Sequence, residues 1–152
     1  HTPNALENIL TTARDFTAGR LFCLFGCGGD RDRSKRPIMG AIAEELADVA
    51  VVTSDNPRTE DPQSIIDEIL AGMSGNAAAR HVEPDRRAAI AWALSQGRPG
   101  DVIVLAGKGH EVYQEVDGGQ HHLDEREVVA EYFQAADNPR QQKTGKVPAD
   151  VI

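Results

Sequence analysis

The sequence predicts an α/β fold built around a doubly wound, mainly parallel sheet. Residues 20–25 and 101–106 contain continuous apolar runs without polar alternation, which is typical of strands covered on both faces. Segments with helical periodicity alternate with these strands, as strands and crossover helices do in a parallel sheet. The clear strands stop at glycines or charged residues, so we expect the loops that follow them to meet at one edge of the sheet.

The helices are predicted from apolar spacing and from capping residues. The first spans residues 3–16, where Thr2-Pro3 supplies a cap and a first-turn proline. Four more helices are expected to begin at or just after Pro37, Asp61, Asp85 and Asp124. The side chains expected to face the core from the first two helices are Leu6, Ile9, Leu10, Ala13, Phe16, Ile38, Ile42, Ala43 and Leu46.

The remaining elements are a third buried strand, a short strand and a hairpin. Residues 50–53 form an apolar, β-branched run, and residues 80–82 form a weaker strand. Asp117-Gly118-Gly119 separates residues 113–116 from residues 120–123, which is a hairpin signal. The polar residues from 137 to 152 are expected to be a tail with little intrinsic structure, which leaves residues 1–136 as one domain.

Composition narrows the class of protein. A chain of 152 residues can bury a real core as one domain, and its net charge of -8, with both signs interspersed, argues against sequence-independent nucleic-acid binding. No membrane-spanning apolar run or signal peptide is visible, so we expect a cytoplasmic protein. The two cysteines are expected to be reduced thiols, and no cysteine pattern typical of zinc is present. The first residue is His1, so we expect an excised or processed chain.

The segment of residues 50–62 predicts a ligand site. The segment passes from a strand through a rigid polar loop to a helix. Pro57 makes the loop rigid because it fixes its own φ angle and restricts the backbone conformation of Asn56. At the carboxyl end of a strand, Arg58 suits a carboxylate and Asp55 suits an ammonium group, so the loop suits a zwitterion. The alternative is a surface turn whose charges face water.

Two further loops are expected at the same edge of the sheet. Residues 26–36 combine glycines with a high density of arginine and lysine, but match neither a dinucleotide fingerprint nor a phosphate-binding P-loop. Gly107-Lys108-Gly109-His110-Glu111 follows the strand of residues 101–106 and also lacks the serine or threonine of a P-loop. Three convergent polar loops make a chance surface arrangement less plausible than one loop does.

These loops together resemble the C-terminal domain of the Mur ligases, and most closely that of the members that add diaminopimelate. The matching segments include Asp55-Asn56-Pro57-Arg58 and the loop of residues 107–111, together with residues 1–6, 25–32 and 35–39. The resemblance implies a Rossmann-like three-layer sandwich. It also implies an ATP- and Mg²⁺-dependent reaction in which the glutamate γ-carboxylate of UDP-N-acetylmuramoyl-L-alanyl-D-glutamate becomes an acyl phosphate that an amine then attacks. This reaction serves peptidoglycan synthesis in the bacterial cytoplasm.

The resemblance also assigns residues. It implies that meso-diaminopimelate contacts Arg31, Asp55, Asn56, Pro57, Arg58, Gly107 and Glu111, and that His1 lies near the nucleotide. It implies no catalytic or metal-binding residue in this domain. The central ATPase domain and the N-terminal UDP-binding domain of the family are not in this sequence, so we expect the isolated chain to be inactive. Sequence alone assigns no chemistry to Lys108 or His110.

Alternatives remain open at this point. Asp137-Asn138-Pro139-Arg140 repeats the motif, but it follows an amphipathic helix, so we interpret it as tail sequence. Other readings are a lysine-adding Mur ligase, a folylpolyglutamate synthase or a stand-alone amino-acid-binding module. Arg58 and the loop of residues 107–111 speak against the first two.

Overall fold

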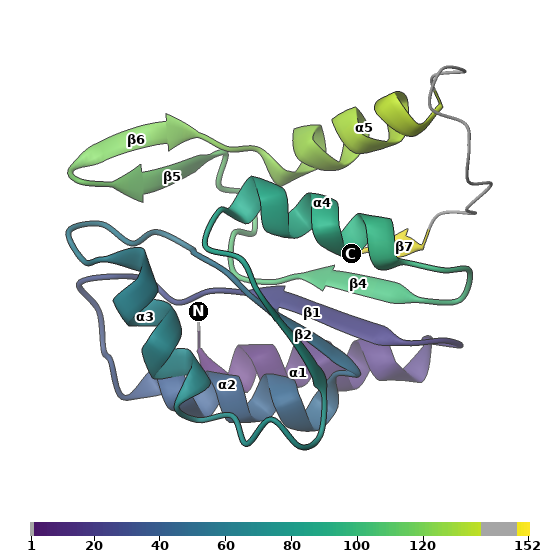
Figure 1. Ribbon diagram of the computed structural model, residues 1–152, viewed down its shortest axis with the longest axis horizontal. Coiled ribbons are helices and arrows are strands. Elements are labelled where there is room, and N and C mark those ends of the chain that lie inside the picture. The colour runs from purple at the N-terminus through teal and green to yellow at the C-terminus, as the bar shows by residue number, and fades with distance from the viewer. Residues whose placement is uncertain (1, 138–148) are drawn as a thin grey trace.

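A five-stranded parallel sheet forms the centre of the molecule. The computed structural model describes residues 2–137 and 149–152 (Figure 1). The strands lie in the order β3-β2-β1-β4-β7, and each neighbouring pair is parallel. Their bounds are β1 (Leu21–Phe25), β2 (Val49–Val52), β3 (Ala79–Val82), β4 (Val102–Leu105) and β7 (Asp150–Val151). The predicted α/β fold with a mainly parallel sheet is therefore confirmed.

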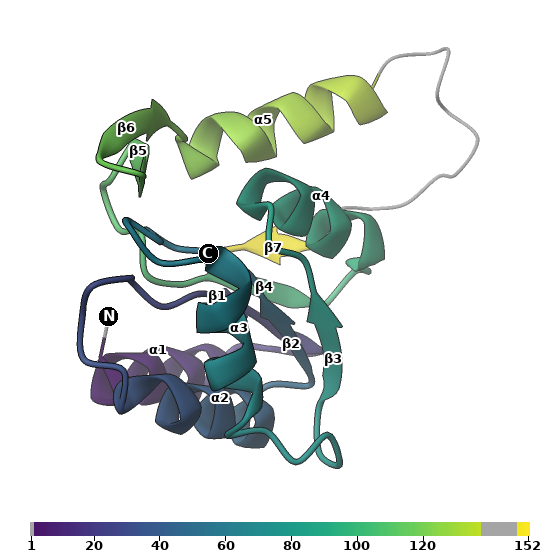
Figure 2. The same cartoon turned by 60° about the vertical axis from the view of Figure 1, so that its left-hand side comes forward.

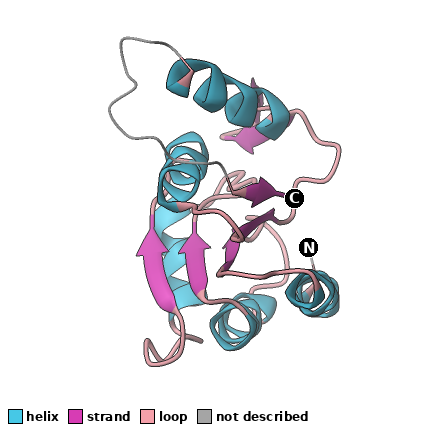
Figure 3. Cartoon of the chain, turned by 90° about the vertical axis from the view of Figure 1, so that its right-hand side faces the viewer, coloured by secondary structure: helices cyan, strands magenta, loops and turns pink. Residues whose placement is uncertain are grey.

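Helices cover both faces of the sheet and give three layers (Figure 3). On one face lie α1 (Pro3–Asp15), α2 (Lys35–Leu46) and α3 (Pro62–Leu70), and on the other lie α4 (Arg86–Gln96) and α5 (Glu125–Ala136). Side chains of β1 alternate between the two core clusters, with Leu21, Cys23 and Phe25 on the first and Phe22 and Leu24 on the second. Because both faces are buried, the whole strand is apolar, as the continuous run predicted.

The predicted caps of α1, α3, α4 and α5 are confirmed, but α2 begins at Lys35 rather than at the expected Pro37, and its N-cap Ser34 forms no side-chain cap hydrogen bond. The side chains of Thr2, Asp61 and Asp85 each accept a hydrogen bond from a backbone N–H in the first turn of α1, α3 and α4. The hairpin is confirmed as β5 (Tyr113–Val116) and β6 (Gly119–His122), an antiparallel pair outside the main sheet. Figure 2 shows the hairpin and α5 together on the α4 side of the sheet.

Three side chains that we expected in the core are exposed. Ile9, Phe16 and Ile38 are 39%, 58% and 50% exposed. In α2 the error has a physical cause, because the helix packs on α3 through Gly40, where a Cβ would lie 2.3 Å from the carbonyl oxygen of Ile69. That contact turns Arg36, Met39 and Ala43 inward and Ile38 outward. Periodicity fixed the helix but not which of its faces is buried.

The last residues correct the expectation of a tail with little structure. Asp150–Val151 forms β7, which pairs with β4 through hydrogen bonds that include the N–H of Ile152 to the carbonyl of Ile103. A two-residue strand has no sequence signal of its own, because its stability comes from the neighbouring strand. Asn138, Pro139 and Arg140 of the second Asp-Asn-Pro-Arg motif lie outside the described residues, as does His1.

Across residues 2–137 and 149–152, none of the helices has the length and apolar composition that crossing a lipid bilayer requires.

Candidate functional site

Three loops meet at the carboxyl edge of the sheet and line a cleft of about 470 Å³. They follow β1, β2 and β4 and comprise residues 26–34, 53–61 and 106–112. Five of the seven residues expected to contact the amino acid line this cleft, namely Arg31, Asp55, Asn56, Arg58 and Glu111. The structure thus brings together side chains that are as far as 80 positions apart in the sequence.

The other predicted site residues lie nearby. Gly107 lines a second, more apolar pocket of about 320 Å³ between α1 and β4. Thr2, Gly26 and Met39 line both pockets, so the two adjoin. Pro57 is buried within the loop of residues 53–61 and does not line the cleft. His1 lies outside the described residues, although its neighbour Thr2 borders both pockets.

Glycine allows the first two loops to touch. The N–H of Gly29 donates to the carbonyl of Asn56 at 2.8 Å. A Cβ on Gly29 would lie 1.8 Å from the carbonyl oxygen of Pro57, which is a severe clash with backbone. The glycines of residues 26–29 therefore serve close packing of one loop on the other.

Arg58 is held in a strained backbone conformation by the hairpin. Its φ angle is 52°, in the left-handed region that non-glycine residues rarely adopt. Its N–H donates to the carbonyl of Glu115, and its carbonyl accepts from the N–H of Asp117. The guanidinium donates through Nε to the Glu115 carboxylate at 2.7 Å and through Nη1 to the carbonyl of Gly29 at 2.9 Å. Its Nη2 has no hydrogen-bond partner among the residues that the structure describes.

A buried cluster surrounds the Asn56 side chain. Its Oδ1 accepts from Lys108 Nζ at 2.7 Å and from the N–H of Glu115 at 3.0 Å, and its Nδ2 donates to Glu111 at 3.2 Å. Lys108 also forms ion pairs with Asp55 at 3.2 Å and with Glu111 at 3.5 Å. Every polar atom of the Asn56 amide is thus engaged, which fixes its orientation.

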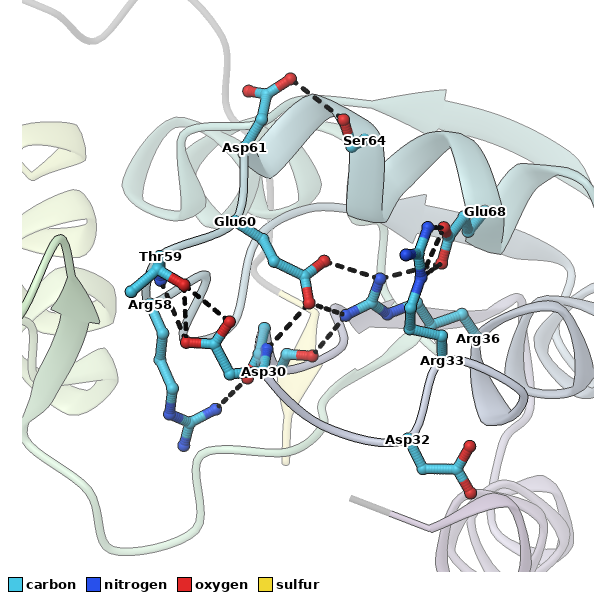
Figure 4. A network of polar contacts seen from close by, with 12 residues as sticks. Asp30, Asp32, Arg33, Arg36, Arg58, Thr59, Glu60, Asp61, Ser64 and Glu68 are labelled. Atoms are coloured by element: carbon cyan, nitrogen blue, oxygen red, sulfur yellow. Dashed lines mark hydrogen bonds and ion pairs between the residues drawn. The ribbon is translucent and has the colours of Figure 1, made fainter.

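A second network fastens the loop after β1 to α2 and α3 (Figure 4). Arg36, which is 1% exposed, donates to Glu60, to Glu68 and to the carbonyl of Gly28. Arg33 also hydrogen-bonds Glu68. Hydrogen bonds from Arg33 and then Arg36 lower the pKa of Glu68 to about 2, and the bond from Arg36 lowers the pKa of Glu60. These two carboxylates therefore stay charged at neutral pH and neutralise the two arginines.

A fully buried arginine connects the other two strand ends. Arg86 donates through Nη1 to the carbonyl of Ser54 and through Nη2 to the carbonyl of Ala106, both at 3.0 Å. These carbonyls belong to the residues just before Asp55 and Gly107. Its Nε pairs with Glu125 at the start of α5 at 2.9 Å. Arg86 thereby fixes the spacing of two site loops across the intervening strand β1.

Among the described residues, the cleft holds neither a thiolate nor a cluster that could bind a metal ion. Burial raises the pKa of the Cys27 thiol to about 12, so the thiol is protonated at neutral pH. Among these residues, no group of three or more histidine, cysteine, aspartate or glutamate side chains is placed to hold a metal ion. The arrangement of charged groups therefore suits binding and orientation of a charged small molecule.

Comparison with known proteins identifies the family. Residues 1–109 match the family described as Mur ligase, glutamate ligase domain. The chain belongs to the Mur ligase family. The resemblance of its motifs to the C-terminal domain of Mur ligases is thereby confirmed.

Relatives and a solved structure agree with this Mur ligase assignment. The chain is 58% identical over 137 residues to UDP-N-acetylmuramoyl-L-alanyl-D-glutamate--2,6-diaminopimelate ligase of Chromobacterium violaceum, covering 89% of this chain and 27% of that protein. For the ligase of the same name from Clostridioides difficile, the identity is 50% over 131 residues, covering 86% of this chain and 27% of that protein. A solved structure of such a ligase superposes with a TM-score of 0.86 at 44% identity, covering 89% of this chain and 28% of that chain. This chain therefore spans about a quarter of the length of these relatives.

Sequence reasoning missed four residues that build or support this cleft, namely Arg36, Arg86, Lys108 and Glu115. Arg36 and Arg86 occur near helix starts, where arginine is ordinarily solvated, so the sequence carries no sign of their burial. Lys108 stands between two glycines directly after a buried strand, and that position was the one available signal. Glu115 lies beside Arg58 only because the hairpin folds onto that loop, a contact that the sequence does not signal.

Proposed function

We propose that this chain is the amino-acid-binding domain of a ligase that adds meso-diaminopimelate to UDP-N-acetylmuramoyl-L-alanyl-D-glutamate. The observation that carries the proposal is the cleft itself, where Arg31 and Arg58 face the same space as Asp55 and Glu111. Diaminopimelate carries two ammonium and two carboxylate groups, so it needs groups of both signs at one site. The names of the relatives, which share 50–60% identity with this chain, support the same substrate.

The residues divide the binding task by charge. Arg58 lines the cleft and its Nη2 is not engaged by the described residues, so with Arg31 it binds the carboxylate at the end of diaminopimelate remote from the reacting amine. Asp55 and Glu111 attract the remote ammonium group, and Asn56 holds Glu111 in place. The other amine then remains free to attack the activated carboxyl group of the second substrate.

The energy-supplying chemistry belongs to other parts of the longer protein. No Gly-Lys-Ser/Thr phosphate loop occurs in the sequence, and the described residues hold no cluster suited to Mg²⁺. The residues present therefore do not fit ATP phosphates or Mg²⁺ by themselves. We assign ATP and Mg²⁺ to a central ATPase domain and the UDP moiety to an N-terminal domain, and we place the reaction in the bacterial cytoplasm.

The test is the substitution Arg58→Ala in the longer protein that carries this domain. Removing one partner of a hydrogen-bonded charge pair costs roughly 2–5 kcal/mol, and each ~1.4 kcal/mol corresponds to about tenfold in rate. We expect kcat/KM for meso-diaminopimelate to fall by at least ~30-fold, while the KM for ATP changes little, because Arg58 contacts the amino acid alone. Steady-state kinetics with both substrates measures this.

The matched control is Arg126→Ala, which also removes one guanidinium. The Arg126 side chain is 78% exposed and pairs with Asp124, outside the cleft. The control should keep kcat/KM for diaminopimelate near that of the parent protein. If Arg58→Ala also retained it, Arg58 would not belong to the site, and the proposed substrate would lose its main support.

A further inference from the structure

Lys108 is a buried cation that contacts three residues lining the cleft, and the proposed function leaves it without a role. The residue is 1% exposed, and its ammonium group lies among four oxygens. These are Asn56 Oδ1 at 2.7 Å, the carbonyl of Tyr113 at 3.0 Å, Asp55 Oδ1 at 3.2 Å and Glu111 Oε2 at 3.5 Å. Lysine is rarely buried unless it is paired, and here it is paired with the two carboxylates assigned to the ligand ammonium.

Lys108 sets the net charge of the cleft wall that Asp55 and Glu111 form. Two carboxylates and one ammonium group leave a net charge of one negative unit around Asp55, Glu111 and Lys108. Arg31 and Arg58 line the same cleft, and Arg58 pairs with the Glu115 carboxylate, so these three groups leave one positive unit. Arg33 and Arg36 together are neutralised by Glu60 and Glu68, so this network adds no net charge. Asp32 and Lys35, which also line the cleft, carry one charge of each sign and cancel in the count.

These net charges complement an amino acid whose remote end carries both an ammonium and a carboxylate group. The remote end of diaminopimelate carries one ammonium and one carboxylate and is neutral overall. The remote end of lysine carries an ammonium group alone and has a net positive charge. A site with one negative and one positive charge complements the remote end of diaminopimelate. With lysine bound, a guanidinium group of the site would lack a carboxylate partner.

We propose that Lys108 is a positioning and specificity residue of the amino-acid site: it fixes Asp55, Asn56 and Glu111 and holds their wall at a single net negative charge, so that the site selects an amino acid with a zwitterionic remote end. This inference rests on the proposed function.

Removing the ammonium group has a consequence with a definite sign. Without Lys108 the wall carries two negative charges, and Asp55, whose side chain is 2% exposed, loses a buried cationic partner. Extra negative charge attracts the lone ammonium of lysine and repels the carboxylate of diaminopimelate. The ratio of kcat/KM for diaminopimelate to kcat/KM for lysine should therefore fall.

The experiment measures both amino acids with the longer protein that carries this domain. Lys108→Met removes the charge and nearly keeps the volume, and Lys108→Arg keeps the charge. For Lys108→Met we expect the KM for meso-diaminopimelate to rise at least ~10-fold and the diaminopimelate-to-lysine ratio to fall at least ~10-fold, with the KM for ATP within about twofold. Lys108→Arg should retain most of the ratio. Arg126→Met, which removes an exposed guanidinium, should leave the ratio unchanged.

A further variant keeps the test decisive if Lys108→Met does not fold. Lys108→Met combined with Asp55→Asn removes one charge of each sign, so Glu111 alone leaves a single negative unit and position 55 no longer carries a buried charge. We expect this pair to fold and to keep a ratio closer to the parent protein than Lys108→Met alone. Two results would overturn the role of Lys108. One is an unchanged diaminopimelate-to-lysine ratio in folded Lys108→Met. The other is a ratio in the double variant that lies at least ~10-fold below that of the parent protein.

The two proposals fail in different ways. If the unsubstituted protein does not use meso-diaminopimelate, the proposed function fails before Lys108 is tested. If it uses diaminopimelate and the folded Lys108 variants keep its KM and the amino-acid ratio, only the role of Lys108 fails.

Discussion

Single residues in and around the cleft adopt conformations or environments that cost free energy in isolation. Arg58 and Asp30 have φ angles of 52° and 55°, and Lys108 carries its charge into the interior. Each is compensated by named partners: the hairpin backbone for Arg58, the N–H and hydroxyl of Thr59 for the Asp30 side chain, and four oxygens for Lys108. The site is therefore held by its surroundings before any ligand binds, as preorganised binding requires.

Gly29 offers a test at this scale. A methyl group at position 29 would overlap the Pro57 carbonyl, so Gly29→Ala should push the loop of residues 26–34 away from the loop of residues 53–61. Overpacking of this kind costs typically 1–3 kcal/mol, and we expect the KM for diaminopimelate to rise by about tenfold or more. Gly119→Ala is the matched control, because its Cβ would meet only ordinary contacts at 3.6 Å. Equal kinetics for the two variants would show that the contact between the loops does not position the site.

At the scale of elements, two arginines fasten the loops to the helices. Arg36 on α2 joins the loop after β1 to Glu60 and to Glu68 on α3, while Arg86 on α4 joins the ends of β2 and β4 to α5. A buried ion pair adds little net stability compared with an apolar replacement. Loss of one partner, however, leaves the other charge buried without compensation and destabilises the fold. These pairs therefore fix geometry more than they add stability.

Acid should weaken the Arg36 network in a defined range. The folded pKa of Glu68 is lowered from an ordinary 4.5 to about 2 by hydrogen bonds from Arg33 and Arg36. A lowered pKa stabilises the fold at pH values above about 4.5, and this stabilisation is lost as the pH falls from about 4.5 towards 2. At pH 7, Glu68→Gln should lower the free energy of unfolding by about 1–3 kcal/mol, as for hydrogen bonds to charged groups.

Urea unfolding at several pH values checks this prediction. The difference between the parent chain and Glu68→Gln should shrink as the pH drops below about 4.5. Glu131→Gln removes a carboxylate that is 65% exposed and pairs with Arg87 on the surface, and it should change stability by less than about 1 kcal/mol. A pH-independent difference for Glu68→Gln would mean that the pKa of Glu68 is not lowered in the folded protein.

At the scale of the whole molecule, the sequence predicted what depends on local pattern. Continuous apolar runs located β1, β2 and β4, and capping residues located most helix starts. The parallel sheet then placed the polar loops at one edge, which brought Asp55 near Glu111 as expected. What the pattern could not predict depends on contacts distant in sequence: β7, the outward face of Ile38, and the burial of Arg36, Arg86 and Lys108.

The most direct test of the amino-acid site is a crystal structure of the longer protein with meso-diaminopimelate bound. The remote carboxylate should lie within hydrogen-bond distance, about 2.7–3.2 Å, of the guanidinium groups of Arg58 and Arg31. The remote ammonium should lie beside Asp55 and Glu111, with Lys108 unmoved behind them. Diaminopimelate bound instead in the apolar pocket between α1 and β4, or with its remote carboxylate turned away from Arg58, would contradict the assignment of this cleft.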